Sequence, residues 1–73
     1  MKNIVIEYSQ EIRNLMETDK DFEAEIKSMY RQWKRENKEY GDIPNVAVIF
    51  SRSGTFDFRY IEKNNLLMID FEN

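Results

Sequence analysis

Apolar side chains recur in a regular stripe between Phe22 and Tyr40. They fall at Phe22, Ile26, Met29, Tyr30, Trp33 and Tyr40. Steps of three and four residues place them on one face of an α-helix. Gly41 follows the stripe and Pro44 comes three residues later, which is typical of a helix end because glycine accepts the left-handed cap and proline cannot continue the helix. The pattern predicts a helix over about 19–40 whose apolar stripe covers another layer of structure.

The residues before this helix fit two interpretations. Ile4, Val5 and Ile6 are β-branched and favour a strand. A helical stripe is also present, at Val5, Tyr8, Ile12, Leu15 and Met16. Because the stripe extends further than the β-branched run, we predict a helix over about 3–17, with residues 3–8 left open between helix and strand.

The stripe that begins at Val5 and the stripe that begins at Phe22 together form one series with heptad spacing. One long coiled-coil helix is therefore an alternative to two helices. Asp19 and Glu36 interrupt this seam, and Trp33 is bulky for a dimeric seam. Thr18 or Asp19 can act as the N-cap of a new helix, with acidic residues in its first turn. We therefore expect a break near residues 18–21.

The second half of the chain reads as three strands, over about 45–51, 55–61 and 66–72. Phe56, Phe58 and Tyr60 alternate with polar residues and therefore share one face of the middle strand. We expect Phe50 opposite Phe56, which leaves a three-residue loop, Arg52-Ser53-Gly54. The first strand would then place Val46, Val48 and Phe50 on the apolar face.

In the second hairpin we expect Tyr60 opposite Leu67 and Phe58 opposite Ile69, joined by the turn at residues 62–65. The last strand is then an edge of the sheet. The sequence thus predicts a single small α+β domain spanning residues 1–73. In it, two N-terminal helices are followed by a three-stranded antiparallel meander, and the second helix packs on one face of the sheet.

The opposite face of this sheet is unexpectedly apolar, since a two-layer domain should leave it polar. The N-terminal segment could cover it through Ile12, Leu15 and Met16. Otherwise this face is a surface for binding a partner or for self-association. The residues that we predict to bind a partner are Ile49, Asp57, Arg59, Ile61, Leu66, Met68 and Asp70.

The amino-acid composition limits the catalytic chemistry that the chain can perform. The 73 residues contain no histidine and no cysteine, the side chains that most often act as catalytic bases and nucleophiles. Asp57 and Asp70 would lie opposite each other and could bind a hard cation, but Arg59 is diagonal to both, so a solvated and charge-compensated surface is the preferred interpretation. We predict no catalytic residue, no metal site and no cofactor.

The net charge of −3 argues against a general nucleic-acid binder, whose affinity rests on neutralising phosphates. Basic side chains are concentrated on the second helix, where single-stranded nucleic acid is an alternative partner: Lys27, Arg31, Lys34, Arg35 and Lys38. No run approaches the ~20 apolar residues that span a membrane, and the start of the chain lacks the pattern of a signal peptide. We expect a cytoplasmic protein without a membrane partner.

The run AVIFSRSGTFDFRYIE resembles the hairpin near the C-terminal end of the YezG-like toxin-immunity (antitoxin) family. The resemblance rests on the helix before it and on Phe50, Gly54, Phe56, Phe58, Tyr60 and Ile61. That family is about twice as long, and the tryptophan that usually enters its first strand is missing here. The resemblance implies a cytoplasmic protein that neutralises a toxin by direct binding, and it assigns no individual site residue.

These observations favour a small non-enzymatic protein-binding module, such as an inhibitor, antitoxin or immunity protein. Its acidic side chains would steer a basic target protein. The alternatives are a homodimeric coiled coil with a structural or regulatory role, and a nucleic-acid binder that uses the basic face of the second helix.

Overall fold

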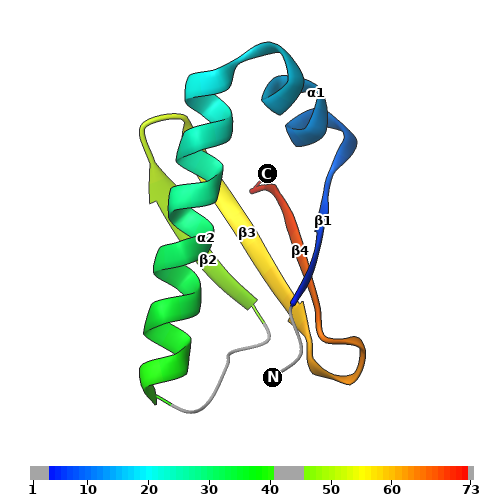
Figure 1. Ribbon diagram of the computed structural model, residues 1–73, viewed down its shortest axis with the longest axis vertical. Coiled ribbons are helices and arrows are strands. Elements are labelled where there is room, and N and C mark those ends of the chain that lie inside the picture. Colours follow the sequence, from blue (N-terminus) through cyan, green and yellow to red (C-terminus); the bar gives the residue numbers. More distant parts are fainter. Residues whose placement is uncertain (1–3, 41–45, 73) are drawn as a thin grey trace.

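The computed structural model describes residues 4–40 and 46–72 and has two layers, a four-stranded sheet and a pair of helices (Figure 1). The elements in chain order are β1 (Val5–Tyr8), α1 (Gln10–Thr18), α2 (Lys20–Tyr40), β2 (Val46–Ser51), β3 (Gly54–Ile61), the short 3-10 helix η1 (Glu62–Asn64) and β4 (Leu66–Phe71). The predicted α+β class and the two helices are confirmed.

Each helix begins at a polar side chain that caps its first turn. Ser9 Oγ accepts a hydrogen bond from the Ile12 amide at 3.3 Å, at the start of α1. Asp19 Oδ1 accepts from the amides of Asp21 and Phe22 at 3.0 and 3.2 Å, at the start of α2. The predicted break is therefore confirmed, and a single continuous helix is excluded.

The predicted start of the first helix is wrong, because residues 5–8 form a strand. β1 pairs in parallel with β4, with Val5 beside Leu66 and Tyr8 beside Ile69. Hydrogen bonds of 3.0 Å from the Val5 amide to the Asn65 carbonyl and from the Ser9 amide to the Ile69 carbonyl flank this pairing. A strand more than fifty residues away in sequence supplies the partner, which outweighs the local helical stripe.

The strand order is β1-β4-β3-β2, so the sheet is mixed and has four strands rather than the predicted three-stranded antiparallel meander. β4 lies inside the sheet, whereas we predicted it as an edge. The edges are β1 and β2. The pairing of β3 with β4 is as predicted, with Tyr60 beside Leu67 and Phe58 beside Ile69.

The predicted register of β2 against β3 is wrong by one residue. Ile49, not Phe50, lies beside Phe56, and the loop is the two-residue Arg52-Ser53. Ser51 Oγ accepts from the Ser53 amide at 3.2 Å and donates to the Gly54 carbonyl at 3.3 Å, which closes this short turn. Gly54 has a φ of 138°, a value that suits glycine.

This shift reverses the two faces of β2. Ala47 and Ile49 now pack against the core, whereas Val46, Val48 and Phe50 point away from the helices. Phe50 is 79% exposed, although we predicted it to be buried.

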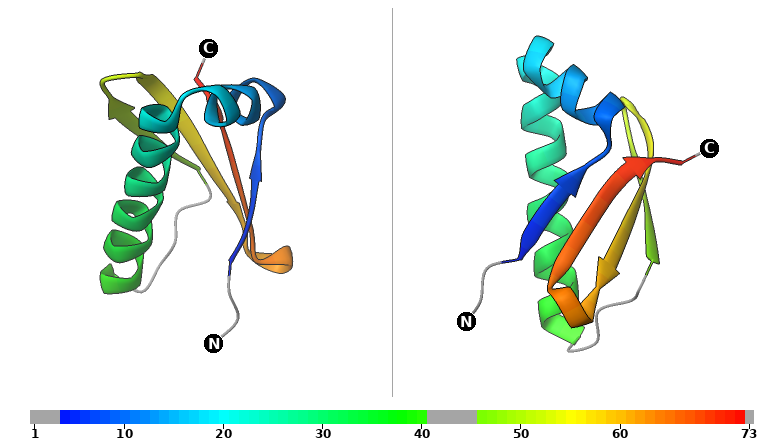
Figure 2. Two further views of the ribbon diagram at one scale, coloured as in Figure 1. Left: turned by 45° about the horizontal axis from the view of Figure 1, so that its top comes forward. Right: turned by 90° about the vertical axis from the view of Figure 1, so that its right-hand side faces the viewer.

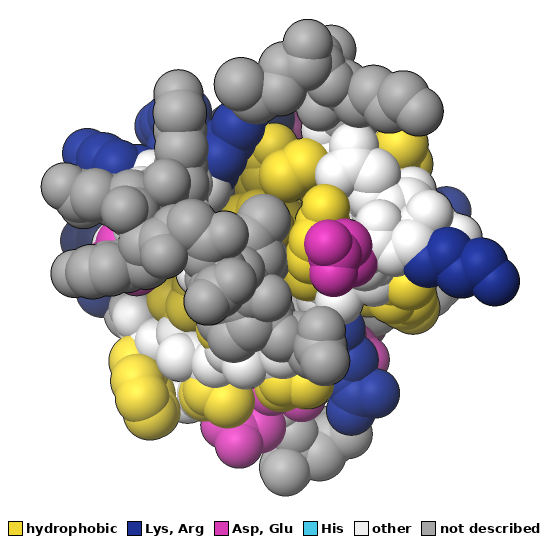
Figure 3. Space-filling view, turned by 90° about the horizontal axis from the view of Figure 1, so that it is seen from below, with side chains coloured by type: hydrophobic (Ala, Val, Ile, Leu, Met, Phe, Trp, Pro, Cys, Tyr) yellow, Lys and Arg dark blue, Asp and Glu magenta, His cyan; other side chains and the backbone are white. Residues whose placement is uncertain are grey.

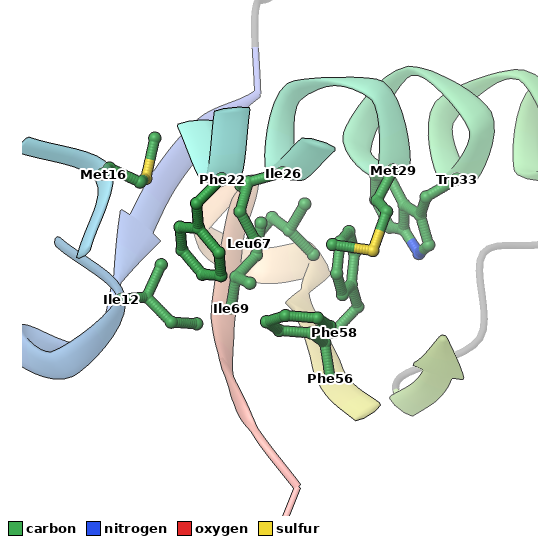
Figure 4. Close-up of a cluster of buried hydrophobic side chains, with 10 residues drawn as sticks. All are labelled: Ile12, Met16, Phe22, Ile26, Met29, Trp33, Phe56, Phe58, Leu67 and Ile69. Atoms are coloured by element: carbon green, nitrogen blue, oxygen red, sulfur yellow. The ribbon is translucent and has the colours of Figure 1, made fainter. Parts of the chain in front are cut away.

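The core lies between the helices and the inner face of the sheet (Figure 4). Trp33, Phe56 and Phe58 are almost completely buried, and the Trp33 ring centre lies 6.2 Å from that of Phe58. The ten core side chains, from α1, α2, β3 and β4, are Ile12, Met16, Phe22, Ile26, Met29, Trp33, Phe56, Phe58, Leu67 and Ile69. The predicted packing of the second helix on the sheet is confirmed.

Ile12 and Met16 belong to this same core, so α1 closes one end of it and does not reach the other face of the sheet (Figure 2). The proposal that the N-terminal segment covers that face is therefore wrong. The predicted helix stop at Gly41 and Pro44, and the side chains of Lys38 and Tyr40, lie outside the described residues and side chains.

The register of β2 can be tested by paired substitutions. We expect Ile49→Asp to lower the free energy of unfolding by about 2–3 kcal/mol, because it places a carboxylate against the core, and Val48→Asp to lower it by less than about 1 kcal/mol. Urea unfolding followed by circular dichroism measures both. A larger loss for Val48→Asp than for Ile49→Asp would contradict this register.

Candidate functional site

The outer face of the sheet, turned away from both helices, is the largest feature that the packing leaves unexplained. We call it the open face. No described element covers it, and the hairpins and β1 bring side chains from all four strands onto it. These are Val5 and Glu7 of β1, Val46, Val48 and Phe50 of β2, Asp57, Arg59 and Ile61 of β3, and Leu66, Met68 and Asp70 of β4.

Apolar groups on the open face form two regions. The first is the β2 ridge, made of Val46, Val48 and Phe50, all exposed. The second, which we call the end patch, joins the far ends of β3 and β4 to β1. It consists of Val5, Ile61, Leu66 and Met68.

Charged side chains separate these two regions. Asp57 lies between Val48 and Asp70, and Arg59 lies between Val46 and Met68. Seen from below, hydrophobic side chains reach the surface along the margin away from the helices, with acidic and basic groups beside them (Figure 3). The open face therefore combines exposed apolar area with a few fixed charges.

The structure places six of the seven predicted partner-binding residues on the open face. Ile49 is the exception, because the one-residue shift of β2 turns it toward the core. Sequence reasoning missed Val46, Val48 and Phe50, since both faces of the segment VAVIFS are apolar and its pattern does not select one. It also missed Val5, because no nearby residue indicates that this segment pairs with β4.

Asp57 and Asp70 lie directly opposite each other, as predicted, with Arg59 on the neighbouring row. Within residues 4–40 and 46–72, no group of three or more potential metal ligands comes together. Arg59 lies on the same face, two residues along β3 from Asp57.

In the part of the chain that the structure describes, two shallow grooves adjoin the open face. One lies where β1 leads into α1 and includes Ser9 and Arg13. Both side chains are engaged there: Ser9 caps α1, and Arg13 Nη2 donates to the Tyr8 carbonyl at 3.4 Å. The other is lined by Arg59, Tyr60, Ile61, Glu62, Lys63 and Met68. This second groove extends the end patch toward the turn at η1.

The described basic side chains of α2, among them Lys27 and Lys34, lie on the helical side of the molecule. Lys27 pairs with Glu23 at 3.7 Å, and Lys34 Nζ lies 6.0 Å from the centre of the Tyr30 ring. Trp33 is 2% exposed, as expected for a core residue, so it offers no surface on which a base could stack.

Glu25 connects α2 to the loop between β2 and β3. Its carboxylate accepts hydrogen bonds from the Ser53 hydroxyl and, at 3.4 Å, from the Ser53 amide. The hydrogen bonds from Ser53 and Ser51 and the charge of Arg52 lower the pKa of Glu25 from its ordinary value of 4.5. This contact holds the β2–β3 hairpin against the helix although β2 contributes no fully buried side chain.

Comparison with known proteins finds no matching family model, no similar curated protein and no similar solved structure. The resemblance to the YezG-like family stays a prediction. Neither described helix combines the length and the apolar character required to cross a lipid bilayer.

The Glu25 contact predicts a pH-dependent effect of Glu25→Gln. Because folding lowers the pKa of this carboxyl, its contribution is present above the unfolded-state pKa and is lost as the pH falls through the folded-state value. We expect the variant to be less stable than the parent near pH 7, and the difference to shrink by about pH 3.

Urea unfolding at both pH values measures this difference. Glu17→Gln, an exposed change on α1, is the matched control. An equal loss of stability for Glu25→Gln at both pH values would show that the charge of Glu25 does not hold the hairpin.

Proposed function

We propose that this protein is a small non-enzymatic module that binds a target protein through its open face, in the manner of an inhibitor, antitoxin or immunity protein. The observation that carries this proposal is the exposure of six apolar residues on a sheet face that no described element covers. A monomeric domain rarely leaves a contiguous apolar area of this kind without a binding role.

The charged side chains on the open face favour binding of a specific target over nonspecific binding of apolar surfaces. Asp57, Arg59 and Asp70 lie among the apolar groups, so a partner must present matching charges to bind without leaving a buried charge unpaired. The acidic excess on this face favours a target with basic groups at the contact.

Three serine hydroxyls, which are potential nucleophiles, have structural tasks, and this supports a non-enzymatic role. Ser9 caps α1, Ser51 closes the β2–β3 turn, and Ser53 bonds to Glu25. The chain contains neither histidine nor cysteine to activate these hydroxyls. We also propose the cytoplasm as the site of action, since a small domain without disulfides suits a reducing compartment.

The two alternatives have less support. A coiled-coil dimer would need the stripe of Phe22, Ile26 and Trp33, which is buried against the sheet. A nucleic-acid binder would need exposed aromatic groups beside the basic side chains of α2, and Trp33 is buried there.

Substitution in the end patch tests the proposal. Ile61 and Leu15 are similarly exposed, at 39% and 37%, but only Ile61 lies on the open face. We expect Ile61→Arg to weaken binding of the target at least about tenfold, because it places a charge in the apolar contact, and Leu15→Arg to leave binding unchanged.

Affinity capture from an extract of the source cells, with parent and both variants at equal loading, identifies a protein retained by the parent and Leu15→Arg only. Titration of that purified protein then gives the affinities. Thermal unfolding confirms that Ile61→Arg is folded. Full binding by folded Ile61→Arg would rule out the open face as the contact.

A further inference from the structure

β2 has a free backbone edge whose direction follows from the pairing. The Glu72 amide donates to the Thr55 carbonyl at 2.9 Å, so the odd-numbered residues of β3 bond toward β4. The even-numbered residues of β3 therefore bond toward β2, where their partners are Ala47, Ile49 and Ser51. This leaves the amides and carbonyls of Val46, Val48 and Phe50 directed outward from the sheet, with no described strand beside them.

Within the described residues, this edge lacks two common forms of protection against pairing. The six residues of β2, VAVIFS, include no charged residue and no proline. The other edge, β1, has only four residues and carries Glu7. Backbone groups and exposed side chains of the β2 ridge thus offer a template for one additional strand.

A row of acidic and polar side chains on α2 begins at Glu25, beside the β2–β3 loop. Glu25 bonds to the β2–β3 loop, which places its flank of the helix on the β2 side. Gln32 and Glu36 follow at seven and eleven residues, which keeps them in line with Glu25, and the Gln32 amide donates to Glu36 at 3.2 Å. On a helical wheel, Lys27, Arg31, Lys34 and Arg35 lie roughly 80° or more from Glu25.

From this arrangement we propose that an extended segment of the target protein, with alternating apolar and basic residues, adds as a fifth strand to the β2 edge. Its apolar side chains continue the β2 ridge on the open face. Its Lys or Arg side chains point to the helical side, toward Glu25 and Glu36. The inference rests on the proposed protein-binding function and specifies the chemistry of the partner.

The charges favour such a segment over a second copy of this chain. Pairing of two β2 strands about a two-fold axis would bring the Glu25 and Glu36 rows of both copies to the same side of the sheet, where they repel. A strand that carries Lys or Arg side chains is instead attracted to Glu25 and Glu36. The backbone edge of β2 is uncharged and can pair with either kind of strand.

Three synthetic octapeptides test the mode of binding against the full chain: alternating Val and Lys, alternating Val and Glu, and the Val/Lys peptide with N-methyl groups on one edge. Nuclear magnetic resonance measures amide shifts, hydrogen exchange and affinity. We expect the Val/Lys peptide to protect the amides of Val46, Val48 and Phe50. We expect its affinity to exceed those of both other peptides by at least about tenfold.

Protein variants isolate the charge contribution. Glu36→Gln is expected to weaken binding of the Val/Lys peptide several-fold, whereas Glu17→Gln, which makes the same change in net charge on α1, is expected to have no effect. Equal affinity for the Lys and Glu peptides, an unchanged affinity after N-methylation, or no binding at all would overturn the proposed strand addition. Protection that rises with protein concentration alone would overturn it in favour of a second copy.

The two proposals fail separately. If Ile61→Arg abolishes target binding while the peptides leave β2 unchanged, the open face binds the target and the edge does not. If the target still binds to folded Ile61→Arg and the Val/Lys peptide protects the β2 amides, the edge alone is the contact.

Discussion

The packing of the apolar stripe of α2 against the inner face of β3 and β4 is the contact on which the rest of the structure depends. Trp33 sits over Phe58 and Tyr60, while Phe22 contacts Phe56 and Phe71. Among the described residues α2 is the one long helix, and it covers one face of the four-stranded sheet. α1 adds Ile12 and Met16 to the same core, so no described element is left for the second face.

The open face is therefore the side of the sheet opposite the two described helices, and its composition is unusual for such a surface. A solvent-facing sheet surface is ordinarily polar, and four strands here place apolar side chains on it. Exposed apolar area of this kind adds little to the stability of the isolated domain and raises the risk of association. In the proposed function this apolar area is the contact with the target, and the interleaved Asp57, Arg59 and Asp70 would restrict which partners fit.

β2 is weakly attached to the core. It contributes no fully buried side chain, and Ala47 and Ile49 only pack at the border of the core. Its position depends on the ladder with β3 and on the bonds from Glu25 to the hairpin loop. A strand held from one side by hydrogen bonds, with an uncharged outer edge, is well suited to accept a further strand, since pairing completes the bonds that the fold leaves open.

Local chemistry in the sequence determined α2, the break at Asp19, the class of the fold and the register of β3 against β4, because each rests on residues close in the chain and on an unambiguous apolar phase. Tertiary structure alone decided two features. Residues 5–8 became a strand because β4 provides a backbone partner that no nearby residue signals. The segment VAVIFS is apolar on both faces, so its sequence does not select the inner one. The two-residue turn and the packing of Ala47 and Ile49 against the core determine the inner face, and Val46, Val48 and Phe50 are exposed as a result.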